Sequence, residues 1–191
     1  MTAAGLGGRT TRNLAVVIVV MLVVDIIALA VHEDPLQWRR VAGPGFSATF
    51  PGQPKPDLKN VSVHGTNVAA HLLVLDSRGR HSFGLLYADY PGNVDVSNPR
   101  AVLDGAAKGS AASINGKLTR TTAGTAVGQP SIDYLIAVPA RTVKGKKFSA
   151  LVIRGRSILR DHRLYSLLVG TPKDDPTDFR RFVASFRLAR A

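Results

Sequence analysis

Few residues of this chain have the types and spacing that catalysis requires. Asp161 and His162 come shortly before Ser166, and an acid, a base and a hydroxyl are the parts of a hydrolase triad. No nucleophile-elbow turn accompanies Ser166, so a charged hairpin tip is the favoured interpretation. The sequence therefore predicts a protein that is not an enzyme.

Metal and phosphate sites have even less support in the sequence. The five histidines have no zinc-type spacing, and the chain contains no cysteine. The stretch 32–34, a histidine, a glutamate and an aspartate, could hold a metal at the membrane surface. Because the sequence has no second ligand cluster, the stretch is interpreted as a solvated flank. Gly105, Gly109 and Gly116 do not follow a strand, as a phosphate-binding loop requires. We expect neither a metal nor a cofactor.

One concentrated basic feature remains, and it consists of four arginines: Arg154, Arg156, Arg160 and Arg163. It is either a docking strip for an acidic partner or the solvated face of an exposed hairpin. The whole chain has 25 basic and 13 acidic residues, a formal net charge of +12. For a domain outside the cytoplasm, that charge favours anionic lipid headgroups or an integral membrane protein complex as partners, and not nucleic acid.

The expected location comes from residues 14–31, LAVVIVVMLVVDIIALAV. At about 1.5 Å per residue, this stretch is long enough to cross a membrane as a helix. It predicts a single transmembrane anchor. Asp25 interrupts the stretch and is expected either to contact a partner helix within the membrane or to reach toward the interface.

The flanks of this stretch predict its orientation. Basic residues precede it and acidic residues follow it, which favours a cytoplasmic tail (1–13), a linker (32–45) and an extracytoplasmic domain (46–191). Trp38, Arg39 and Arg40 suit the membrane interface. Residues 28–30 (Ala-Leu-Ala) resemble a signal peptidase site, so cleavage after Ala30 is the alternative, although the length of the apolar run favours a retained signal-anchor.

The remaining residues contain alternating strand patterns and two helix patterns. Strands are expected at 46–50, 61–63, 69–75, 81–90, 118–122, 131–138, 148–159 and 164–169. A helix over 99–114 is predicted from an asparagine cap and Pro99 at one end and Asn115 at the other. A second helix, capped by Asp175, carries the phenylalanine stripe of residues 179, 182 and 186. This order predicts an α+β domain, an antiparallel β-sheet flanked by helices.

Several motifs give this region a resemblance to a known bacterial domain type. They are FSATFPGQP (46–54), YADYP (87–91), LDGA (103–106), GKL (116–118), GQP (128–130), RLYSL (163–167) and FVASF (182–186). Together they resemble an extracytoplasmic domain of unassigned function with a PsbP/Mog1-like α/β/α sandwich. This chain differs from the usual pattern of that domain type at residues 160–162, Arg-Asp-His, where a Gly-Asn turn is usual.

This resemblance implies a fold and says little about function, because one fold hosts many functions. Two hypotheses follow. In the first, the protein is a non-catalytic accessory subunit of a larger membrane complex, with a respiratory electron-transfer complex as the example. In the second, it is a free-standing cell-envelope module that binds a lipid, a wall polymer or a small ligand.

Overall fold

The computed structural model describes residues 37–63, 66–77, 81–143 and 146–189. Its centre is a seven-stranded antiparallel sheet in the order β3-β4-β5-β11-β10-β7-β6. The strands are β3 (Lys55–Val63), β4 (Thr66–Ser77), β5 (His81–Asp89), β6 (Lys117–Ala126), β7 (Gln129–Val138), β10 (Leu151–Arg160) and β11 (Arg163–Thr171). A separate short hairpin joins β8 (Arg141–Val143) to β9 (Lys146–Phe148).

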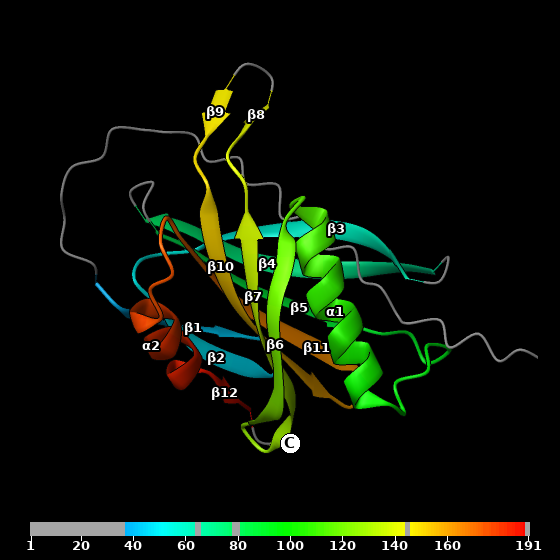
Figure 1. Ribbon diagram of the computed structural model, residues 1–191. Coiled ribbons are helices and arrows are strands. Elements are labelled where there is room, and N and C mark those ends of the chain that lie inside the picture. Colours follow the sequence, from blue (N-terminus) through cyan, green and yellow to red (C-terminus); the bar gives the residue numbers. More distant parts are fainter. Residues whose placement is uncertain (1–36, 64–65, 78–80, 144–145, 190–191) are drawn as a thin grey trace, which may run out of the picture.

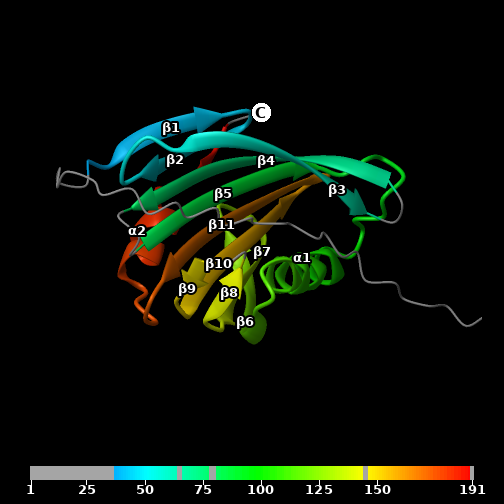
Figure 2. The same cartoon turned by 90° about the horizontal axis from the view of Figure 1, so that it is seen from above.

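The two faces of this sheet are covered by different elements. Helix α1 (Pro99–Ser113) packs on one face against β6, β7 and β10. The other face carries helix α2 (Thr177–Ser185) and a small sheet of β1 (Arg39–Gly43), β2 (Phe46–Phe50) and β12 (Arg187–Leu188). Figures 1 and 2 show these layers. Each face therefore has its own hydrophobic core.

Helix α1 forms as its sequence predicts. The Asn98 side chain accepts a hydrogen bond from the Ala101 amide at 3.1 Å, and Pro99 occupies the first turn. After the helix, Asn115 adopts the left-handed conformation with φ of 52°. The buried face is rich in alanine and glycine, so the helix approaches the sheet closely.

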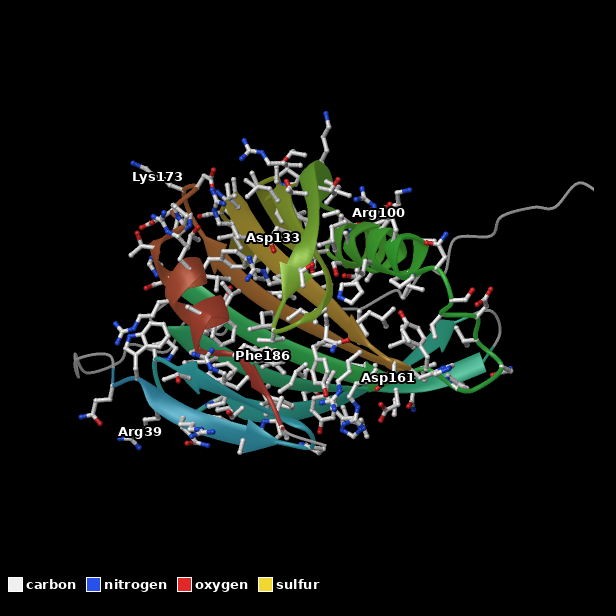
Figure 3. All side chains as sticks on the ribbon, turned by 90° about the horizontal axis from the view of Figure 1, so that it is seen from below. Arg39, Arg100, Asp133, Asp161, Lys173 and Phe186 are labelled. Atoms are coloured by element: carbon white, nitrogen blue, oxygen red, sulfur yellow. The ribbon has the colours of Figure 1, made fainter. Side chains whose placement is uncertain are left out.

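Helix α2 confirms the predicted phenylalanine stripe. Phe179 and Phe182 are buried within it, and Phe186 is buried directly after it. The helix begins slightly later than predicted, at Thr177, whose amide donates to the Asp175 carboxylate at 2.9 Å. The stripe joins Phe46 and Phe50 of the small sheet in a second core. Figure 3 shows Phe186 beside α2.

The predicted fold class is wrong. Strand makes up 58% and helix 17% of the structure, so the fold is mainly β and not α+β. Several parts of the sequence form more strand than predicted. The segment 39–43, predicted as linker, forms β1 and pairs with β2. The hairpin of β8 and β9 was not predicted, and β3, β6 and β7 are longer than their patterns indicated.

The predicted single-pass membrane location also requires correction. No helix in the described ranges is both long enough and apolar enough to span a membrane. Residues 14–31, Asp25 and the possible cleavage position after Ala30 lie outside the described residues. The transmembrane-helix and signal-anchor predictions therefore have no support in the described fold.

Candidate functional site

An open pocket lies at one end of the central sheet, where β5 ends and β10 turns into β11. Its volume is about 440 Å³. The lining residues come from this turn, from β5, from the turn between β1 and β2, and from the end of the described chain: Gly45, Asp89, Arg160, Asp161, His162, Arg163, Tyr165 and Ala189. We call this the polar pocket. Figure 3 shows Asp161 at the β10–β11 turn that forms part of its wall.

Arg163 fixes the shape of the polar pocket. Its Nε and Nη2 atoms donate to the two carboxylate oxygens of Asp89 at 2.5 and 2.6 Å. Its Nη1 atom donates to the carbonyl oxygen of Pro44 at 3.0 Å. A bidentate guanidinium–carboxylate pair has a defined geometry. Arg163 therefore joins β11, β5 and the β1–β2 turn, and its nitrogen atoms all have partners within the protein.

Arg160 differs from Arg163 because most of its donors are free of protein partners in the described part of the chain. Its Nη1 atom donates to the Ala189 carbonyl oxygen at 3.0 Å. Its Nε atom lies 3.9 Å from Asp161, too far for a normal hydrogen bond. A guanidinium has five N–H donors. Arg160 can thus hold its position and still donate to a ligand.

Glycine is required at position 45 of the pocket wall. Gly45 has a φ of +80°, a conformation that other residues rarely adopt. A Cβ atom here would lie 3.1 Å from the Tyr165 hydroxyl and 3.2 Å from an Arg163 nitrogen. Because Gly45 has no side chain, the β1–β2 turn can lie next to the Tyr165 hydroxyl and the Arg163 guanidinium and leave the space beside them open.

A row of side chains crosses the sheet beside the polar pocket. The strand register places Leu58, His71, Tyr87 and Tyr165 opposite one another on β3, β4, β5 and β11. The rings of His71 and Tyr87 stack with their centroids 4.8 Å apart and an interplanar angle of 6°. Leu58 is 56% exposed, and His71 is also exposed. Tyr87 is half-buried and Tyr165 is buried, so this row, the aromatic row, offers an apolar surface beside the polar pocket through Leu58, His71 and part of Tyr87.

The charges of the pocket perturb one another. The Arg163 guanidinium, mainly by hydrogen bonding, lowers the pKa of Asp89 below its ordinary 3.8. The same pair raises the pKa of Arg163. A carboxylate with a lowered pKa stabilises the fold above its unfolded pKa, and this contribution is lost as the pH falls through the folded pKa.

We therefore expect Asp89→Asn to lower the urea midpoint at pH 7 and to have a smaller effect at an acid pH below 3.8, because the contribution of the carboxylate declines as the pH falls through its lowered folded pKa. The effect is modest because the Asp89 side chain is 60% exposed. Asp161→Asn is the matched control, because the Asp161 side chain is 89% exposed and its contact with Arg160, at 3.9 Å, is too long for a hydrogen bond. A loss in Asp89→Asn that is equal at both pH values would contradict this electrostatic account.

The structure separates the residues of the considered triad. Asp161 and His162 are exposed at the β10–β11 turn, whereas Ser166 is buried. The Ser166 hydroxyl lies 2.7 Å from that of Ser157, inside the sheet. These positions give no base within reach of the serine.

The four arginines of the predicted docking strip do lie on adjacent strands, but most are already paired. Arg154 contacts Asp174 at 2.6 Å, and Arg156 forms a bidentate pair with Asp133 at 2.6 and 2.8 Å. Arg163 binds Asp89, as described above. Arg160 has the longest of these contacts, 3.9 Å from its Nε atom to the exposed carboxylate of Asp161, and it belongs to the polar pocket.

The predicted membrane-interface residues contact the domain itself. Trp38 packs edge-on against Phe83, with ring centroids 5.8 Å apart. The Arg181 guanidinium lies 4.1 Å from the Trp38 ring centroid. Arg40 donates to the Ser47 hydroxyl at 3.1 Å, and Arg39 is exposed on β1 and donates to Gln37.

Sequence reasoning missed most of the polar pocket. It identified Arg160 and Arg163 as charged residues but did not connect them with Asp89, Gly45 or Tyr165, because strand order cannot be read from spacing alone. Two signals were present. Asp89 directly precedes a tyrosine-proline strand end, and Pro44-Gly45 marks a tight turn.

Comparisons with known proteins do not identify a family. No family model matches the chain, and no curated protein matches its sequence. Among solved structures, the chain is similar to LpqN, described as involved in cell envelope biogenesis of Mycobacterium tuberculosis. The identity is 13%, the TM-score is 0.42, and the match covers 81% of this chain and 91% of that one. A likeness of this size assigns neither a fold family nor a function to the chain.

Proposed function

We propose that this domain is a non-catalytic binding module, and that its polar pocket holds a hydroxyl-rich ligand such as a segment of a wall polymer. The observation that carries the proposal is the mixture of donors and acceptors around one open pocket. Arg160 and His162 supply donors, and Asp161 and the outer lone pairs of Asp89 supply acceptors. Hydroxyl groups both donate and accept, so they match such a lining.

The charge of the pocket supports this ligand class over a simple anion. Two arginines and two aspartates line it, so their formal charges cancel when His162 is neutral. A phosphate or sulfate site would instead show an excess of positive charge or free backbone amides. The accessible members of the aromatic row, Leu58, His71 and the half-buried Tyr87, supply an apolar surface of the kind that the carbon face of a sugar ring contacts.

The proposal retains the binding function of the envelope-module hypothesis. A role as a subunit of a respiratory complex has no support in the comparisons. The basic strip that suggested protein docking is largely neutralised by its own aspartates.

Arg160→Ala tests the proposal. Titration calorimetry with chitotetraose as a neutral sugar, and with inorganic phosphate as an anion without a carbon scaffold, should show binding of the sugar alone. We expect Arg160→Ala to weaken sugar binding by about tenfold to a hundredfold, because a hydrogen bond to a charged group contributes about 1.5–3 kcal/mol. Arg100→Ala, on the exposed side of α1, is the matched control and should bind as the wild type does (Figure 3).

Two results would overturn the proposal. One is the absence of sugar binding at millimolar concentration. The other is equal binding by Arg160→Ala and the wild type, which would place any sugar site elsewhere. Tight phosphate binding without sugar binding would assign the pocket to anions and would also contradict the proposal.

A further inference from the structure

Strand β6 is the less protected edge of the central sheet. It pairs with β7 on one side, and no described strand pairs with its other side. None of its ten residues is buried, and eight are exposed. Figure 1 shows the strand at this edge. Because successive residues of an edge strand direct their backbone groups alternately, half of its N–H and C=O groups point away from β7.

The opposite edge of the sheet is protected in ways that β6 is not. Strand β3 contains Pro56, which cannot donate to an added strand, and a pair of charges, Asp57 and Lys59, 3.1 Å apart. Natural proteins use prolines and charges of this kind to prevent pairing at sheet edges. In β6 the stretch 121–126, TTAGTA, has neither a proline nor a charge. Among the described residues, no strand pairs with the outer side of this stretch, so another strand can add to it.

The charges that border this stretch are positive. Lys117 and Arg120 are exposed on β6, and neither forms an ion pair with a described residue. The nearest carboxylate across the strand pair, Asp133, lies opposite Thr122 and is already bound by Arg156. A binding partner would therefore meet uncompensated positive charge at one end of β6.

We propose that the outer edge of β6 binds an extended, acidic polypeptide segment, which adds an eighth strand to the sheet. The main chain of the segment supplies the hydrogen bonds, and its carboxylates pair with Lys117 and Arg120. A second copy of this chain fits less well, because each copy carries a net charge of +12 and the two would repel each other. The inference does not depend on the ligand of the polar pocket.

A pair of synthetic peptides tests the proposal with the full-length protein. Both peptides are short, have capped termini and alternate threonine with valine. They differ in the residue at each end, which is glutamate in one peptide and lysine in the other. We expect the glutamate peptide to bind about tenfold more tightly at low salt, with less difference near 1 M salt, where the Debye length is about 3 Å. Outward-facing amides of β6 should become protected from hydrogen exchange when it binds.

Variants locate the binding site on the protein. Arg120→Glu should abolish the preference between the two peptides, because the new carboxylate offsets the charge of Lys117, whereas Lys59→Glu on β3 is the matched control and should leave the preference unchanged. Thr121→Pro and Thr122→Pro are made as two separate variants. The backbone amides of adjacent strand residues point in opposite directions, so one of the two variants removes an outward-facing amide of β6. The one that removes an outward amide keeps the β6–β7 hydrogen bonds and should fold but lose binding.

Three outcomes would overturn the proposal: no peptide binding at millimolar concentration, protection at amides other than those of β6, or a preference that Arg120→Glu does not change. Concentration-dependent dimerisation of the wild type that Thr121→Pro or Thr122→Pro abolishes would assign the edge to a second copy instead, and would also reject the acidic segment.

Discussion

Truncation of Phe182 to alanine is expected to lower the free energy of unfolding by about 3–5 kcal/mol. Phe182 is fully buried between α2 and the central sheet. Its ring lies 4.8 Å from that of Phe50 on β2 and 5.7 Å from that of Phe83 on β5, both in edge-on arrangements. The substitution would leave a cavity where three elements meet, and it would remove both aromatic contacts.

Urea unfolding followed by tryptophan fluorescence measures this loss, because Trp38 packs directly against Phe83 and reports on the same core. Arg180→Ala is the matched control, since Arg180 is exposed on the same helix. It should change stability by less than about 0.5 kcal/mol. A loss below about 1 kcal/mol in Phe182→Ala would mean that α2 does not pack on the sheet as described.

Gly155→Ala is expected to cost about 1–3 kcal/mol, although alanine usually suits a strand better than glycine does. Gly155 lies opposite Tyr134 in the register of β10 and β7. An added Cβ atom would lie 2.2 Å from the Tyr134 ring. The ring cannot move away easily, because it is buried and its hydroxyl lies 3.4 Å from the hydroxyls of both Ser110 and Ser157.

The matched control for this substitution is Gly124→Ala on β6. A Cβ atom at that position would lie 3.8 Å from its nearest neighbour, the Ser131 hydroxyl, which is an ordinary contact. We expect this variant to be as stable as the wild type or slightly more stable. Equal thermal midpoints for the two variants would contradict the close packing of Tyr134 over Gly155.

Local signals in the sequence predicted local structure well. The cap at Asn98 and the left-handed Asn115 bound α1 as expected, because both depend on neighbouring residues alone. The stripe of Phe179 and Phe182 is buried because helical spacing places these residues on one face. Strand β2 has the predicted bounds because Pro51-Gly52 ends it.

Non-local pairing explains what the sequence did not predict. The segment 39–43 alternates weakly and is mostly exposed or half-buried, so only its pairing with β2 makes it a strand. The fold class was wrong for a related reason, since long strands such as β6 carry no apolar alternation. The polar pocket unites Gly45, Asp89 and Arg160, which are far apart in the sequence. The strand order β5-β11-β10 brings Asp89 near Arg160, and the packing of the small sheet on the central sheet adds Gly45.

The central claim, that the polar pocket binds a hydroxyl-rich ligand, is tested most directly by nuclear magnetic resonance. Backbone amide shifts of the isotope-labelled protein would be followed during titration with chitotetraose. The account predicts shifts that cluster at Gly45, Asp89 and residues 160–165, with smaller shifts at His71 and Tyr87 of the aromatic row. Shifts confined to other surfaces, or no shifts at millimolar sugar, would contradict it.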